Sequence, residues 1–201
     1  MSVIDAIRQR RSVRRYRPDE IPEEVLNNLL ETLRLAPSGK NRQPWKFIVV
    51  KDAETRRKLA RACRYTPGKT DGQWFVAEAP VVLVACGFEL DAAAAVYRDG
   101  ELFISDGATA REEMKKRPGK YWSCLPIDLA IALDHFSLAA AEQGLGTCWI
   151  AGLIESEVKA ILSVPDEVTT PLLMPVGYPV SWPEPKPRKP LSEIICYEKF
   201  S

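Results

Sequence analysis

The chain contains a single histidine, His135, and no two cysteines in a C-x-x-C spacing. A metal centre or a Ser/His/Asp triad would therefore have to rest on His135 alone, and a hydrogen-bonded histidine in the core or at an interface is the simpler interpretation. The five cysteines are odd in number and widely spaced, which argues against a disulfide framework. We therefore expect a cytoplasmic protein, because thiols persist in a reducing compartment.

Long apolar runs and an excess of charge of one sign are also missing. No stretch approaches the ~18 uncharged apolar residues that a membrane span requires, and the N-terminus lacks the apolar centre of a signal peptide. Lys and Arg total 28 against 27 Asp and Glu, a net charge of +1, so no global field attracts nucleic acid. We expect one soluble domain over residues 1–201, with no nucleic-acid and no membrane partner.

The common nucleotide-binding motifs are absent too. The Gly144-Leu145-Gly146 stretch is not followed by the third glycine of a dinucleotide fingerprint, and the chain contains no P-loop. Rossmann-type binding and ATP chemistry are therefore unsupported.

Positive charge is nevertheless concentrated locally. Residues 8–17, RQRRSVRRYR, hold six arginines and no acid, and a second basic segment lies in the proline-rich tail, PVSWPEPKPRKP. Paired guanidinium N–H groups suit a phosphate oxyanion, but a solvated basic face explains the arginines equally well. Nucleic-acid binding is the weaker alternative, because no interleaved aromatic residues or recognition-helix pattern accompany the charge.

Apolar periodicity predicts the first half of the fold. Ser2 caps a helix with Val3, Ile4 and Ile7 on one face, and a second helix opens at Pro22 and closes before Pro37. Residues 45–51 are predicted to form a strand, 53–63 a helix, and 80–86 a strand buried on both faces.

The second half has three unusual segments. Residues 91–116 are predicted to be weakly helical and to form a lid. Residues 126–143 form a helix that is apolar nearly all round and ends at Gly144, which favours contact with a second subunit. Residues 169–178 are predicted to be a strand whose pairing Pro171 and Pro175 limit. The tail after it ends in apolar residues that require burial, namely Ile194, Ile195, Tyr197 and Phe200.

Five motifs, taken in order, resemble the nitroreductase family of flavin enzymes over nearly the whole chain. They are Arg10-Arg11-Ser12-Val13-Arg14; Ala36, Pro37, Ser38, Asn41, Gln43, Pro44 and Trp45 of APSGKNRQPW; GLGTCWIAG at residues 144–152; Pro175-Val176-Gly177-Tyr178-Pro179; and Lys186-Pro187-Arg188.

The resemblance implies an α+β fold with a mixed central sheet flanked by helices. It also implies an intertwined homodimer with FMN at the interface and the C-terminal tail wrapping the partner. The implied activity is hydride transfer from NADH or NADPH, through FMN, to a nitroaromatic, quinone or flavin by a substituted-enzyme mechanism. A relative using FMN for dehalogenation or flavin fragmentation, or an FMN carrier or sensor, remains an alternative.

The resemblance also assigns residues to the cofactor. Arg10, Ser12, Lys186 and Arg188 hold the phosphate, Arg14 lies near the ring, Pro37, Ser38 and Asn41 reach the FMN of the other subunit, and Ile150 to Gly152 cover one flavin face. The full predicted set is Arg10, Arg11, Ser12, Arg14, Pro37, Ser38, Gly39, Asn41, Gln43, Ile150, Ala151, Gly152, Lys186 and Arg188. No catalytic side chain and no metal are implied. The acceptor, the preferred nicotinamide, the roles of Lys69, Asp71 and Gln73, and the function of residues 91–117 stay open.

Overall fold

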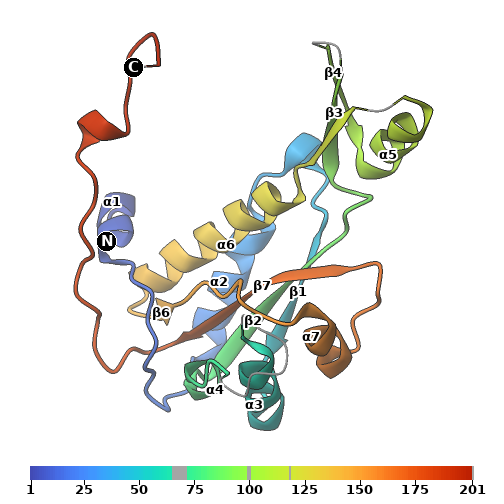
Figure 1. The fold of residues 1–201 in the computed structure, drawn as a ribbon. Coiled ribbons are helices and arrows are strands. Elements are labelled where there is room, and N and C mark those ends of the chain that lie inside the picture. The colour runs from blue at the N-terminus through green and yellow to red at the C-terminus, as the bar shows by residue number, and fades with distance from the viewer. Residues whose placement is uncertain (65–71, 99–100, 118, 201) are drawn as a thin grey trace.

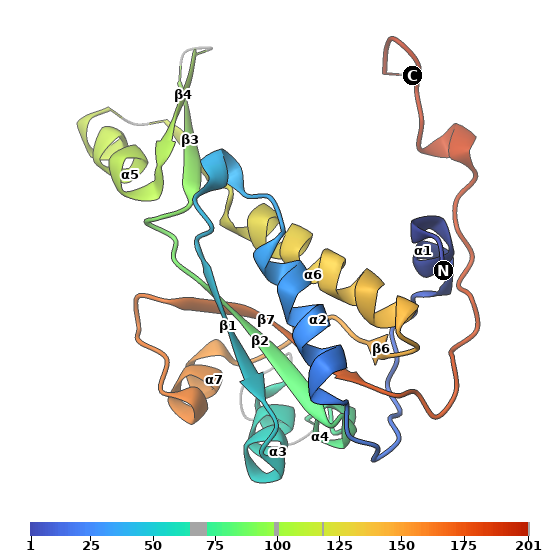
Figure 2. The same ribbon diagram turned by 180° about the vertical axis from the view of Figure 1, so that it is seen from behind.

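A computed structural model describes residues 1–64, 72–98, 101–117 and 119–200. A four-stranded sheet lies at the centre, with helices on both faces, and a smaller three-stranded sheet extends from one end (Figures 1 and 2). The elements are α1 Val3–Gln9, α2 Glu23–Arg34, the 3-10 turn η1 Gly39–Asn41, β1 Trp45–Val50, α3 Ala53–Ala62, α4 Phe75–Glu78, β2 Val81–Gly87, β3 Ala93–Arg98, β4 Glu101–Asp106, α5 Gly107–Lys116, β5 Lys120–Ser123, α6 Leu125–Glu142, β6 Gly146–Thr147, α7 Glu155–Leu162, β7 Thr169–Gly177 and η2 Leu191–Glu193.

The central sheet has the order β1-β2-β7-β6, and the paired strands in it are antiparallel. A parallel contact is made by the isolated bridge between Ser12 and Thr147. The expected α+β class is confirmed, and the parallel component of the sheet is limited, among the described residues, to that bridge.

The alternating side chains of β2 explain why this strand is buried on both faces, as predicted. Val81, Leu83 and Ala85 pack with α2 and α6, while Val82, Val84 and Cys86 pack with α3, α4 and α7. Burial raises the pKa of Cys63 to about 12 and that of Cys86 to about 11, so both thiols stay protonated core groups.

The predicted apolar helix is α6, and Gly144 follows it in a left-handed conformation (φ +74°) that ends it. Its inner face packs on α2 and the sheet through residues such as Leu129, Leu133 and Phe136. His135 is exposed on the outer face, so a place in the core of this chain is excluded and the interface alternative remains. Within the described ranges, no helix is long and apolar enough to span a membrane.

The prediction of a helix over residues 91–116 was wrong for its first half. Residues 93–98 and 101–106 form the antiparallel strands β3 and β4, and only 107–116 are helical. The missed signal is the Asp99-Gly100 pair of the sequence, a hairpin-turn dipeptide between two runs with aromatic and β-branched residues. The small sheet β4-β3-β5 and α5 form the excursion, which stands away from the central sheet (Figure 1).

The two prolines of β7 restrict its pairing less than expected, because β7 lies inside the sheet between β2 and β6. The Leu173 N–H donates to the Ile150 carbonyl at 3.0 Å, so the nitrogens of Pro171 and Pro175 face the same side as that N–H. Among the described residues, that side pairs through the short β6, a 3.4 Å hydrogen bond from Cys148 N to Pro175 O and the Ile150 bridge. The missing N–H donors therefore face the sparsely paired edge of β7.

The C-terminal segment after β7 leaves the body of the molecule (Figure 1). Its start is held by two hydrogen bonds, from Arg17 N to Tyr178 O at 2.9 Å and from Val180 N to Arg15 O at 3.1 Å. Trp182 packs, partly buried, against Val13 and Tyr16, but the large apolar side chains from Leu191 onward are exposed, up to 85% for Tyr197 and 100% for Phe200. Within the described residues, the end of the tail therefore has little stabilising burial in its own chain.

Candidate functional site

The N-terminal basic segment runs in an extended conformation beside β6. Ser12 forms its bridge with Thr147, and the Val13 N–H donates to the Thr147 carbonyl at 2.9 Å. The Val13 side chain is buried in the molecule. Because side chains alternate along an extended segment, Ser12 and its neighbours Arg10 and Arg14 face the opposite side, away from the core.

These three residues all lie in the electrostatic surroundings of Cys148. Burial raises the pKa of the Cys148 thiol, and this shift is opposed by Arg14, by a hydrogen bond with Ser12 and by Arg10. All three predicted residues are therefore close enough to act on one buried atom. The structure brings them together on the outer side of residues 147–148.

Arg11 differs from its neighbours in where its guanidinium points. Nη1 donates to the carbonyl oxygens of Arg8 at 2.5 Å and Arg10 at 2.8 Å, which satisfies acceptors at the end of α1. Arg14 instead is exposed, with its guanidinium carbon 5.9 Å from the centroid of the Phe75 ring. Arg14 Nη1 donates to the Ser12 carbonyl at 3.4 Å, and the side chain is the more exposed of the two.

Gly146 allows the basic segment to approach the backbone closely. A Cβ at this position would lie 2.4 Å from Val13 Cγ2, inside van der Waals contact. The hydroxyl Oγ1 of the neighbouring Thr147 is buried and has no hydrogen-bond partner in the described part of the chain.

The predicted cofactor residues Ile150 to Gly152 follow β6 along the chain. Ile150 is buried and exchanges two hydrogen bonds with Leu173, at 2.9 and 3.0 Å, whereas Ala151 is exposed. The Gly152 carbonyl accepts from Gln73 Nε2 at 3.2 Å. Gln73 therefore holds this segment in place, while Lys69 and Asp71 lie outside the described residues.

The loop at Pro37 to Gln43 forms a second group of predicted residues. The Ser38 hydroxyl accepts from the Gln43 N–H at 2.8 Å, and Gln43 Nε2 donates to the carbonyl and side-chain oxygens of Asn41 at 3.2 and 3.3 Å. Pro37, Asn41 and Gln43 are exposed. Part of the polar character of this loop therefore stabilises the loop itself.

This loop also contacts the excursion. Lys40 Nζ donates to the Ile104 carbonyl at 3.3 Å, and Arg42 reaches the Asp91 carbonyl at 3.4 Å and the Asp106 carboxylate at 3.5 Å. Asp106 also caps α5, and its hydrogen bonds from Thr109 lower the pKa of the carboxyl to about 2. The excursion therefore borders the second group of predicted residues.

The two groups lie at opposite ends of α6. Gly39 at one end donates its N–H to Asp128 in the first turn of α6, and Gly146 to Cys148 follow the last turn. A helix of 18 residues spans about 27 Å at 1.5 Å per residue. Within one chain, the loop and the basic segment are thus separated by nearly the length of this helix.

Lys186 and Arg188 lie in the exposed tail that starts beside Arg15 and Arg17. Arg188 Nη1 lies 3.4 and 3.3 Å from the carbonyl oxygens of Lys186 and Pro187 in its own segment. The structure shows no hydrogen bond or ion pair, among described residues, that joins these two side chains to Arg10 or Ser12.

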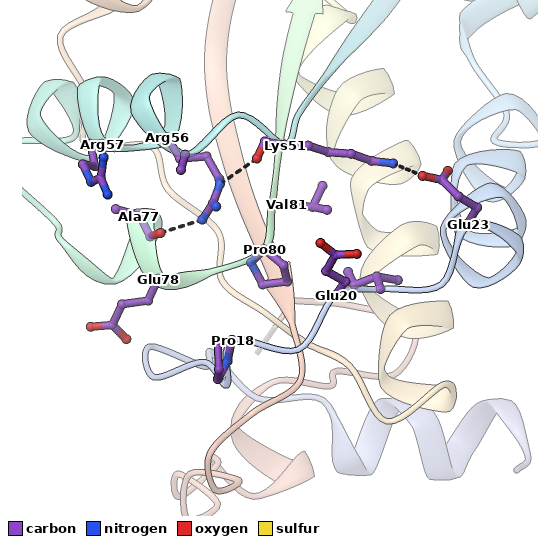
Figure 3. Close-up of a pocket in the computed structure, with 12 residues that line it drawn as sticks. Pro18, Glu20, Glu23, Lys51, Arg56, Arg57, Ala77, Glu78, Pro80 and Val81 are labelled. Carbon is purple, nitrogen blue, oxygen red and sulfur yellow. Dashed lines mark hydrogen bonds and ion pairs between the residues drawn. The ribbon is translucent and has the colours of Figure 1, made fainter.

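A different cavity, of about 390 Å³, lies between the starts of α2 and α3 (Figure 3). Three of its charged side chains have partners in the fold: Arg56 donates to the carbonyls of Lys51 at 3.2 Å and Ala77 at 2.6 Å, and Lys51 pairs with Glu23. None of the predicted cofactor residues lines it. We interpret this cavity as a structural junction.

The fold and the first group of residues define a class: α+β proteins that offer basic side chains, a hydroxyl and a close backbone approach to an anionic ligand. The Nitroreductase family model matches residues 7–178, so the chain belongs to the nitroreductase family.

Curated relatives span most of the chain. A protein named NADH dehydrogenase from Thermus thermophilus is 33% identical and covers 94% of this chain and 92% of its own. An iodotyrosine deiodinase from Thermotoga neapolitana is 27% identical (98% and 97%), and an FMN reductase (NADPH) from Bacillus subtilis is 26% identical (96% and 72%). A solved nitroreductase family protein from Clostridium difficile superposes with a TM-score of 0.74 at 27% identity, over 100% of both chains.

Proposed function

We propose that this protein is a homodimeric, FMN-dependent oxidoreductase that transfers hydride from NADH or NADPH to a small acceptor such as a nitroaromatic, a quinone or a flavin. The observation that carries the proposal is the convergence of Arg10, Ser12 and Arg14 on one side of an extended segment, next to the close backbone approach at Gly146. The family and the names of its relatives, which include an FMN reductase, agree with this assignment.

The residues present fit FMN. A phosphate dianion is best held by guanidinium and ammonium groups together with a hydroxyl donor, and Arg10, Ser12, Lys186 and Arg188 provide this set. Lys186 and Arg188 are two residues apart, so they face the same side wherever the tail is extended. Because Gly146 has no Cβ, the segment that carries Ser12 can lie close against β6.

A second subunit explains the distance between the two groups of residues. The outer stripe of α6 consists of Ile127, Ile131, His135 and Leu138, which recur at three- or four-residue spacing. A two-fold contact with the two α6 helices antiparallel brings the loop of one chain to the basic segment of the other. Each FMN then contacts Arg10 and Ser12 of one chain and Ser38 and Asn41 of its partner.

The exposed apolar surface supports the same assembly. An apolar groove between α1, α2 and α6 is lined by Val3, Leu35, His135 and Leu138 among others. Val3, Leu35 and the tail residue Leu191 are 70%, 63% and 72% exposed. A monomer seldom leaves this much contiguous apolar surface in water, and we propose that the tail of the partner covers it.

In the proposed mechanism, FMN would supply the ability to accept and return a hydride when bound. The chain would hold and orient it: Arg10, Ser12, Lys186 and Arg188 would bind the phosphate, and Ile150 to Gly152 would lie against the ring. The Arg14 guanidinium would favour negative charge on the ring by Coulomb attraction. With Ile150 to Gly152 on one side, donor and acceptor would share the remaining place in turn.

Kinetics test this function. In anaerobic stopped-flow experiments, NADH or NADPH should bleach the purified yellow protein, and a nitroaromatic or quinone should restore the colour. Initial-rate plots should give parallel lines, and excess acceptor should compete with the nicotinamide. Intersecting lines together with a trapped ternary complex would reject the shared site.

Replacing Arg14 tests the charge near the ring. Arg14→Gln should lower the midpoint potential of the bound flavin, by about 30 mV for each tenfold change in the two-electron equilibrium. Arg15→Gln is the matched control, because Arg15 is an exposed neighbouring arginine that is not assigned to the flavin. Equal potentials for the two variants would remove this role from Arg14.

The similarity to an iodotyrosine deiodinase keeps reductive dehalogenation as a second candidate. Halide release from a halogenated phenol would identify this activity, and a protein that NADH and NADPH both fail to reduce would instead be a carrier or sensor. The proposed compartment is the reducing cytoplasm, in keeping with the buried thiols of Cys63 and Cys86.

A further inference from the structure

Asp128 is a buried carboxyl group in an otherwise apolar part of α6. Its side chain is 2% exposed, and Oδ1 accepts a hydrogen bond from the Gly39 N–H at 2.9 Å. Oδ2 is also buried and has no hydrogen-bond partner within the described ranges. Burial raises the pKa of Asp128, while the bond from Gly39 opposes the rise. Burial of a carboxyl group in the core is energetically unfavourable, and the hydrogen bond to Gly39 compensates for part of that cost.

The loop that Asp128 holds has an unfavourable backbone conformation. Lys40, Asn41 and Gln43 have φ values of 55°, 55° and 51°, in the left-handed region that residues other than glycine avoid. Such residues persist where surrounding contacts fix them, and they concentrate at ligand-binding sites.

The contacts that fix this loop come from three sources. Ser38, Asn41 and Gln43 bond one another, and Lys40 and Arg42 reach the excursion through partly exposed contacts of 3.3 to 3.5 Å. Asp128 supplies the remaining anchor, and it is the one that comes from a helix buried in the main core. Ala36 and Trp45 hold the two ends of the loop against that core, and within the described residues the Asp128 carboxyl group anchors its middle at Gly39.

We propose that Asp128 is a positioning residue for the flavin: through its bond to Gly39 it fixes the loop so that Ser38 and Asn41 meet the FMN held by the partner subunit. This inference rests on the proposed function. Asp128 itself does not touch the cofactor in this arrangement. Because the phosphate is assigned to Arg10, Ser12, Lys186 and Arg188, the loop contacts the ring and ribityl part, which FMN and riboflavin share.

The test compares FMN and riboflavin titrations of three variants. Asp128→Leu keeps the branching at Cγ but removes the acceptor, and it should raise the Kd of FMN and riboflavin by the same factor, about tenfold or more, the usual scale for a hydrogen bond to a charged group. Asp128→Asn retains Oδ1 as acceptor and should change both constants by less than about threefold, on the scale of a neutral hydrogen bond. Ser137→Ala, which removes another buried polar group of α6, should leave both unchanged.

A double-mutant cycle separates positioning from general destabilisation. If Asp128 acts through the loop, Ser38→Ala should weaken flavin binding less in the Asp128→Leu background than in the wild type. If Asp128→Leu does not fold, Asp128→Glu takes its place, since it shifts the carboxylate by one methylene, and the Kd values of both flavins should again rise equally. Light scattering should show that each variant used remains a dimer.

Unchanged flavin affinity in a folded, dimeric Asp128→Leu protein would overturn the inference, as would a loss confined to FMN or additive effects in the cycle. Failure of the wild-type protein to bind FMN would instead reject the proposed function, so the two failures are distinguishable.

Discussion

Deletion of residues 191–201 is expected to abolish dimer formation and FMN binding. The deleted segment carries Leu191, Ile194, Ile195, Tyr197 and Phe200, all at least 46% exposed in the single chain. These side chains gain burial only from another surface, and the apolar groove between α1, α2 and α6 is the surface we assign to them. We expect the intact interface to exceed roughly 2,000 Å², the size typical of obligate dimers.

The measurements are light scattering and flavin absorbance of the purified protein. The truncated chain should elute as aggregate or as colourless monomer, because the deletion uncovers the groove on the partner and separates the two halves of each FMN site. Lys199→Ala provides a control within the same segment, since it changes an exposed charged residue without removing apolar surface. A stable yellow monomer after truncation would contradict both the interface and the shared site.

Replacement of Arg188 by alanine is expected to weaken FMN binding by about 1.5–3 kcal/mol, the scale of hydrogen bonds to charged groups, or roughly 10- to 150-fold in Kd. The thermal midpoint of the FMN-free protein should stay unchanged, because Arg188 is exposed and, among the described residues, its hydrogen bonds go to carbonyl oxygens of its own segment. Riboflavin, which lacks the phosphate, should bind the variant as it binds the wild type. Isothermal titration with both ligands measures these constants.

Lys189→Ala is the matched control for Arg188→Ala. Lys189 is the next cation in the chain, pairs with Glu193 at 3.9 Å, and faces the opposite side of an extended segment. Its loss removes the same charge without removing the assigned ligand. Equal affinity of the wild-type protein for FMN and riboflavin would exclude the phosphate role of Arg188.

Local interactions made several elements predictable from the sequence. Ser2 and Asp5 form the expected capping box on α1, and Leu26, Leu29 and Leu33 place one face of α2 in the core at helical spacing. The motifs of the basic segment, the loop and residues 144–152 named candidate residues for the site. Each of these signals depends on residues a few positions apart, which the sequence displays directly.

The main error was the helix predicted over residues 93–106, where the local sequence signals are weak. The runs Ala93–Arg98 and Glu101–Asp106 have no strong helical or alternating pattern, and the hairpin is stabilised by pairing between β3, β4 and β5. The exposed position of His135 could not be predicted either, because the sequence of a helix that is apolar nearly all round does not indicate which face packs on the sheet.

The sequence by itself determined the family, the elements with strong periodicity and the residue types available to a phosphate-bearing cofactor. Only the tertiary structure decided that the basic segment packs on β6, that the loop lies at the other end of α6, and that Asp128 holds this loop through Gly39. Asp128 is one of three acidic residues in a largely apolar helix, and the sequence does not show which of the three has a buried partner. The physical reason is that these contacts join residues far apart in the chain, and such contacts form only when the packing of the sheet and helices brings their elements together.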